Sequence, residues 1–103
     1  MINELSGTHA RNTSLFSSHG FVLFFLADHS GATIRQISDA LDLSERRVHS
    51  IVKSLEETGY LRINRIGPRN EYEIRLDARL GHPLLQNVSI GSLITATGHG
   101  VPT

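Results

Sequence analysis

Five polar side chains that suit nucleic acid fall within eight consecutive positions of this chain. They are Arg46, Arg47, His49, Ser50 and Lys53. Arginine pairs bidentately with guanine or with phosphate, lysine binds phosphate as a point charge, and serine and histidine reach either bases or phosphates. This combination predicts contacts with a nucleic-acid backbone and with base edges, provided that one element presents the five together.

A helix over residues 45–58 would separate these side chains from a core. On a helical wheel the apolar face consists of Val48, Ile51, Val52 and Leu55. The opposite face consists of Arg46, Ser50, Lys53 and Glu57, flanked by Arg47 and His49. An ordinary solvated helix face would explain the same charges. A face built for stability alone, however, favours acidic residues in the first turn, where only Glu45 fits.

The neighbouring sequence predicts the elements that hold this helix. Helices are expected over residues 15–29 and 33–41, because apolar residues recur there at helical spacing. Thr33 and Ser44 are the expected N-caps of the second and third helices, and Gly59 is expected to end the third. The apolar face of the third helix is expected to pack on Ile37, Leu41, Leu61, Ile74 and Phe24.

The chain beyond Gly59 predicts a β-hairpin and a last helix. Apolar and polar residues alternate over 60–66 and 71–76, on either side of a Gly-Pro-Arg-Asn turn at 67–70. Pro83 is expected to stop the preceding segment and redirect the chain. Residues 84–96 include Ile90, Leu93 and Ile94 at helical spacing, and Ser89 is the expected cap.

At 103 residues, the chain is expected to form one domain with extensions. The expected division is a flexible arm at 1–14, a winged helix-turn-helix domain at 15–80, a C-terminal tail helix for dimerisation at 81–97 and a disordered tail at 98–103.

The charge is balanced over the whole chain but unevenly distributed along it. Ten Lys and Arg residues balance ten Asp and Glu residues. Residues 44–76 hold seven basic and five acidic residues, whereas residues 1–43 hold two and four. Arg62, Arg65 and Arg69 of the hairpin add cations near the third helix. Local positive charge of this kind is sufficient for a footprint the size of one groove.

Other chemistries find little support in the sequence. The absence of Cys excludes disulfides, thiolate metal sites and a cysteine nucleophile, and the six His residues show no metal-ligand spacing. No nucleophile elbow, phosphate-binding glycine loop or acid–base pair is present, so neither catalysis nor a cofactor is expected. The apolar run 21–27 is too short to span a bilayer. A signal peptide is the rival interpretation of that run, and a cytoplasmic location is expected.

The stretch TIRQISDALDLSERRVHSIVKSLEETGYLRINRIGPRNEYEI resembles the small winged helix-turn-helix regulators of the MarR/ArsR type in bacteria and archaea. The resemblance rests on Ala40, on Leu43-Ser44 at the cap and on LEETGYL at 55–61. GHPLLQNVSIGSLI is similar to the tail of single-domain members, so the resemblance extends over about residues 16–95. Asp42 departs from the glycine that often occupies this turn, and the cysteines of ArsR-type metal sensors are missing.

The resemblance implies a sequence-specific regulator of transcription that binds double-stranded DNA. Helix 45–58 would enter the major groove, and the wing at 65–70 would touch the backbone or the minor groove. The implied DNA-binding residues are Thr33, Arg35, Ser44, Arg46, Arg47, His49, Ser50, Lys53, Arg65 and Arg69. Two alternatives stay open: a winged helix used for protein–protein contact, and a regulator with an effector pocket between the first helix and the tail.

A homodimer is also expected. The first helix and the tail helix carry more apolar residues than one small core covers, and symmetric operators favour two-fold proteins. The expected interface consists of Leu15, Phe16, Val22, Phe25, Leu26, Leu84, Leu85, Ile90, Leu93 and Ile94. The fold expected overall is thus a mainly α winged helix-turn-helix, with a three-helix core, a two-stranded wing and a C-terminal dimerisation helix.

Overall fold

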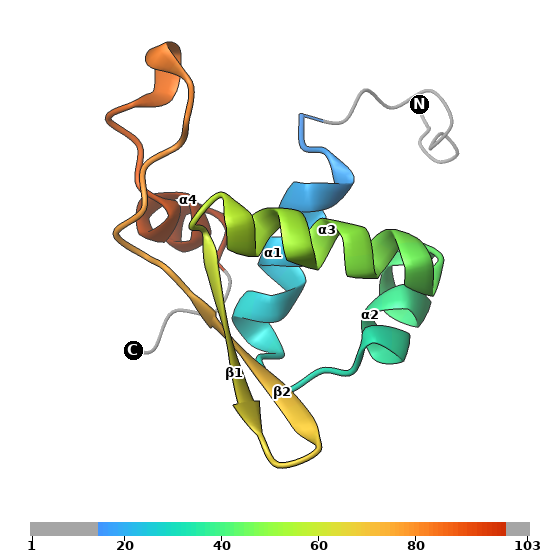
Figure 1. Ribbon diagram of the computed structural model, residues 1–103. Helices are drawn as coiled ribbons and strands as arrows, with labels where there is room; N and C mark the ends of the chain where they lie inside the picture. The colour runs from blue at the N-terminus through green and yellow to red at the C-terminus, as the bar shows by residue number, and fades with distance from the viewer. Residues whose placement is uncertain (1–14, 99–103) are drawn as a thin grey trace, which may run out of the picture.

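The computed structural model describes residues 15–98, so the expected arm at 1–14 and residues 99–103 of the expected end lie outside the described residues. The elements are α1 (Ser18–Asp28), α2 (Ile34–Leu41), α3 (Glu45–Glu57), β1 (Leu61–Ile66), β2 (Arg69–Ile74), the short 3-10 helix η2 (Pro83–Leu85) and α4 (Ile90–Thr97). Figure 1 shows the helices grouped together and the hairpin extending from them as a wing. The predicted winged helix-turn-helix fold is confirmed.

Local hydrogen bonds fix the turn between α2 and α3. Thr33 Oγ1 accepts from the Gln36 N–H at 3.0 Å and Gln36 Oε1 accepts from the Thr33 N–H at 2.8 Å, which is a capping box. Asp42 ends α2 with a φ of 56°, in the left-handed region, although the resemblance favours glycine there. The Asp side chain tolerates this region better than most residues, so the tight turn survives without glycine.

Both ends of α3 are capped as expected. Ser44 Oγ accepts from the Arg47 N–H at 3.0 Å. At the other end Gly59 has a φ of 87°, and its N–H donates to the Glu56 carbonyl while the Tyr60 N–H donates to that of Leu55. This paired arrangement is a Schellman motif, which satisfies two free carbonyls and directs the chain immediately into β1.

The wing is an antiparallel hairpin with a shorter turn than the sequence suggested. Its register pairs Leu61 with Ile74 and Ile66 with Arg69, which leaves Gly67 and Pro68 as the two-residue connection. Gly67 has a φ of 59°. A positive φ at the first central residue and the fixed φ of proline at the second match a type II′ turn. The prediction of a four-residue turn was therefore wrong, and β2 begins at Arg69.

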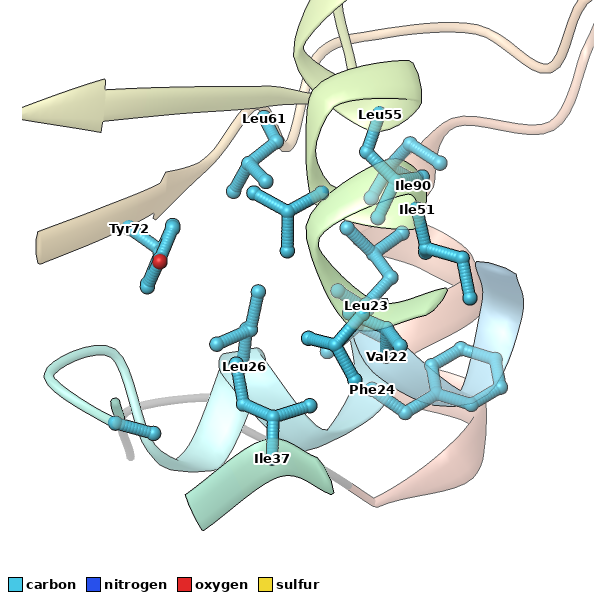
Figure 2. Packing of buried hydrophobic residues seen from close by; sticks show 14 residues of the cluster. Val22, Leu23, Phe24, Leu26, Ile37, Ile51, Leu55, Leu61, Tyr72 and Ile90 are labelled. Atoms are coloured by element: carbon cyan, nitrogen blue, oxygen red, sulfur yellow. The ribbon is translucent and has the colours of Figure 1, made fainter. Parts of the chain in front are cut away.

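The core lies between α1, α3 and the base of the wing. Figure 2 shows Leu23 of α1 close to Ile51 of α3, whereas Leu26 of α1 lies next to Ile37 of α2. All four residues of the predicted apolar face of α3 are buried, and so are Phe24, Ile37 and Leu61, which were expected to meet it. Leu41 and Ile74 pack at the margin of the same cluster. The predicted orientation of α3 is thus confirmed.

Part of the predicted dimer interface lies inside this core instead. Val22, Leu26, Ile90 and Ile94 are each at most 1% exposed in the single chain. α1 is apolar on nearly all sides because its own chain surrounds it, with α2, α3 and β2 packed against it and residues of α4 in the same cluster. The assignment of these four residues to a dimer interface was wrong.

Within residues 15–98 no helix is long and apolar enough to cross a membrane.

The segment between β2 and α4 forms a projecting arm, residues 81–87. The Leu80 N–H donates to the Val88 carbonyl at 3.1 Å, and the Ile90 N–H donates to that of Ala78 at 2.8 Å, so the two ends of the segment pair at its base. Figure 1 shows the arm projecting from the body at the end opposite the wing tip. Pro83 opens η2 within it, and Leu84 is 86% exposed.

Candidate nucleic-acid interface

The outward face of α3 carries the side chains that the sequence singled out. Its five predicted contact residues, Arg46, Arg47, His49, Ser50 and Lys53, are all exposed. Arg46, Arg47 and Lys53 form no ion pair with any carboxylate within residues 15–98. The ion pair between Arg75 and Asp77 lies outside this face of α3. These positive charges are therefore available to an anionic partner, since no carboxylate of the described chain neutralises them.

An open groove of about 500 Å³ lies between α3 and the wing. The groove is lined by His49, Ser50, Val52, Lys53 and Glu56 of α3, by Ile63, Asn70 and Tyr72 of the wing, and by Ile34 of α2. Three of the predicted contact residues thus share one concave surface with the inner side of the hairpin.

A second depression of about 210 Å³ continues this surface towards the wing tip. Its lining consists of Gly31, Ala32, Thr33, Ile34, Arg65, Pro68, Arg69, Asn70 and Tyr72. Ile34, Asn70 and Tyr72 line both hollows, so we call the two together the basic groove. The structure therefore brings Thr33, Arg65 and Arg69 to the same surface as Ser50 and Lys53.

Four predicted residues lie outside the lining of the basic groove. Arg46 and Arg47 occupy the first turn of α3, and Arg46 lies one turn before Ser50 on the same face. Ser44 is the N-cap, where its hydroxyl oxygen is already used but its proton remains free to donate. Arg35 is exposed on the first turn of α2.

Asn70 and Glu56 also line the basic groove and were not predicted as site residues. The sequence predicts Asn70 in the turn, but the residue belongs to β2 and lies opposite Arg65. It shares the inward face of β2 with Tyr72 and Ile74, and the period-two alternation of the strand was the signal that could have found it. Glu56 places a carboxylate one turn beyond Lys53 and so limits the positive surface at the C-terminal end of α3.

The outer face of the wing has a different charge pattern. Arg62 lies opposite Glu73 and Asn64 lies opposite Glu71, and the Asn64 Nδ2 donates to Glu73 Oε1 at 3.5 Å. Neighbouring opposite charges reduce the net field on this side. Arg62 therefore contributes less to the positive surface than Arg65 and Arg69, although the charge count did not distinguish them.

Metal chemistry finds no site in the described part of the chain. Among residues 15–98 no group of three or more His, Asp or Glu side chains is placed to hold a metal ion. Two of the histidines have local contacts instead. The His29 ring lies 4.3 Å from that of Phe25, and His82 Nδ1 accepts from the Leu84 N–H.

Comparison with known proteins agrees with this geometry. Residues 22–62 match a family model described as winged helix-turn-helix DNA-binding. That segment runs from α1 through α2 and α3 into the start of β1. No significant match was found among curated proteins or among solved structures. The order of the elements identifies the fold as a winged helix-turn-helix, and the segment that runs from α1 into β1 is similar to a family of DNA-binding domains with this fold.

Proposed function

We propose that this protein is a sequence-specific regulator of transcription that binds double-stranded DNA, similar to the MarR/ArsR type and acting in the cytoplasm. The observation that carries the proposal is the basic groove. It joins the exposed cation Lys53 of α3 with Arg65 and Arg69 of the wing tip on one surface, and none of the three forms an ion pair within residues 15–98. The major groove of B-DNA is wide enough to admit one α-helix.

In this arrangement the two elements have different tasks. α3 lies in the major groove, where Arg46, Ser50 and His49 reach base edges from its first turns. Lys53, Arg65 and Arg69 bind phosphates on either side of that groove, or reach the minor groove from the wing. Base contacts set the preferred sequence, whereas phosphate contacts set the register and most of the affinity.

Titration of duplex DNA at two salt concentrations tests this function against use of the wing for protein–protein contact. The duplex is first selected from a random pool by binding to the protein. Three phosphate contacts per subunit predict that log K falls with log salt with a slope of about −3 for each bound subunit. A protein-interaction module would show no salt-sensitive binding to any duplex, and that result would exclude the proposal.

Removing the wing-tip charge is expected to weaken binding to all duplexes alike. Arg69→Ala deletes one phosphate contact, so the salt slope should become shallower by about one unit per subunit. Arg62→Ala is the matched control, because it removes the same charge from the hairpin at a position opposite Glu73. Fluorescence anisotropy on selected and scrambled duplexes measures both variants. A change of sequence preference in Arg69→Ala would contradict its assignment to the backbone.

We propose that the regulator acts as a homodimer, through exposed apolar residues and not through the four buried residues Val22, Leu26, Ile90 and Ile94. The projecting arm at residues 81–87 presents Leu84, which is 86% exposed, and Leu85, which is 44% exposed. Leu15, which precedes α1, is 90% exposed. A second copy of this chain is the occupant we propose for them, because two-fold proteins match symmetric operators.

Leu84→Asp is expected to shift the protein from dimer to monomer. The carboxylate would be buried in the interface without a partner, whereas in the monomer it would stay in water. Sedimentation velocity at tens of micromolar measures the change, and circular dichroism should show that the monomeric variant keeps the folded structure. Wild-type protein that sediments as a monomer at this concentration would rule out the homodimer.

A further inference from the structure

Asn70 is a polar residue on the packed side of the wing. It belongs to β2 and lies opposite Arg65 in the register. Ile34 and Tyr72 line both parts of the basic groove together with it. Its side-chain oxygen, Oδ1, is buried and has no hydrogen-bond partner among residues 15–98.

The fold alone gives no reason for an amide at this position. A buried carbonyl that has lost its water and gained no partner destabilises the folded state. Asparagine is also disfavoured in strands, where β-branched and aromatic residues pack better. Leucine has almost the same shape and would avoid the desolvation of Oδ1. Departures of this kind from local preference are expected at functional positions.

The other end of the same amide is accessible. Within residues 15–98 Oδ1 is the side-chain polar atom that is both buried and unpaired, and no hydrogen bond is formed by Asn70 Nδ2. Asn70 therefore offers two N–H donors to the basic groove, while its unpaired acceptor, Oδ1, is buried and inaccessible from there. Phosphate oxygens only accept hydrogen bonds, so a group that only donates matches them, and the neighbouring Arg65 and Arg69 add positive charge.

We propose that Asn70 is a DNA-backbone contact of the wing, in which Nδ2 donates to a phosphate oxygen while Oδ1 remains directed inwards. Arg65 on the facing strand and Arg69 next in the chain bind the same stretch of backbone. This inference rests on the proposed function and adds to it a contact that carries no charge. If the proposal holds, Asn70 lowers the stability of the folded protein and raises its affinity for DNA.

Asn70→Leu tests this signature with two measurements that should move in opposite directions. Removing the unpaired oxygen is expected to raise the melting temperature by about 5 °C. Removing the donor is expected to raise the Kd by about fivefold for selected and scrambled duplexes alike. Asn64→Leu is the matched control on the outer face of the wing, where the Nδ2 meets Glu73. It should neither raise the melting temperature nor change the Kd.

Several results would overturn the assignment of Asn70. A lower melting temperature for Asn70→Leu would show that the amide supports the fold. An unchanged Kd would show that it does not touch DNA, and a loss confined to the selected duplex would show a base contact instead. Lys53→Ala separates these results from failure of the proposed function. If wild-type protein binds duplex DNA and Lys53→Ala binds it less well, an unchanged Kd for Asn70→Leu rejects this inference alone. Wild-type protein without affinity for duplex DNA rejects both this inference and the proposed function.

Discussion

Ile51→Asp is expected to abolish the folded state. Ile51 has 0% exposure and belongs to the buried apolar face of α3, together with Val48, Val52 and Leu55. An aspartate there would be a buried carboxylate without a partner, which destabilises a protein by several kcal/mol even after its pKa rises to neutralise it. The free energy of unfolding of a protein domain is only about 5–15 kcal/mol, and small domains such as this one lie towards the lower value.

Circular dichroism and thermal melting measure this loss. We expect Ile51→Asp to show no cooperative transition and no duplex binding. Lys53→Ala is the matched control on the same helix, because Lys53 is exposed and outside the core. Its stability should stay within about 0.5 kcal/mol of wild type, while its affinity for duplex DNA falls. A folded Ile51→Asp protein, or an early-melting Lys53→Ala protein, would mean that α3 presents a different face to the core.

The orientation of α3 was predictable because the signals that fix it are local. Ser44 and Gly59 cap the helix through bonds to residues three to five positions away, so the sequence contains everything needed to place its ends. The apolar period then fixes which side faces inwards, and Ile51 and Lys53 follow from it.

The turn of the wing was mispredicted although its signals are also local. Glycine, proline and asparagine all favour turns, so the run Gly-Pro-Arg-Asn at 67–70 predicts one four-residue loop. Gly67 and Pro68 already satisfy the two dihedral requirements of a type II′ connection. Arg69 and Asn70 are therefore free to pair with the opposite strand. The consequence for the site is that Asn70 faces the basic groove.

The choice between core and interface could not be made from the sequence, because it depends on which elements meet. Val22 and Ile90 are 68 positions apart in the printed sequence, and no local pattern shows that they belong to one cluster. Apolar residues on all sides of α1 indicate that more than one face is covered, but not whether the same chain or a second copy covers it. The same reasoning applies to the basic groove, where Ile34, Ser50 and Asn70 come from three separate elements.

Arg46→Ala is expected to have the largest effect on recognition of the selected duplex. A bidentate contact to a guanine contributes about 1–3 kcal/mol of discrimination, so the Kd should rise by about 5- to 150-fold. Stability should not fall, because an arginine in the first turn of α3 opposes the helix dipole. Anisotropy on the selected duplex and on single-base variants measures both the loss and the change in preference.

Arg46→Lys separates base reading from charge. Lysine keeps the positive charge but lacks the planar pair of donors that fits guanine, so binding to scrambled duplexes should be retained while the preference for the selected sequence is lost. If Arg46→Lys kept both the affinity and the preference of wild type, Arg46 would be a phosphate contact. The base-reading task would then pass to Ser50 and His49, which lie beside the wing in the basic groove. Ser50→Ala should show the larger loss of preference in that case, because α3 would enter the major groove by its middle turns instead of its first.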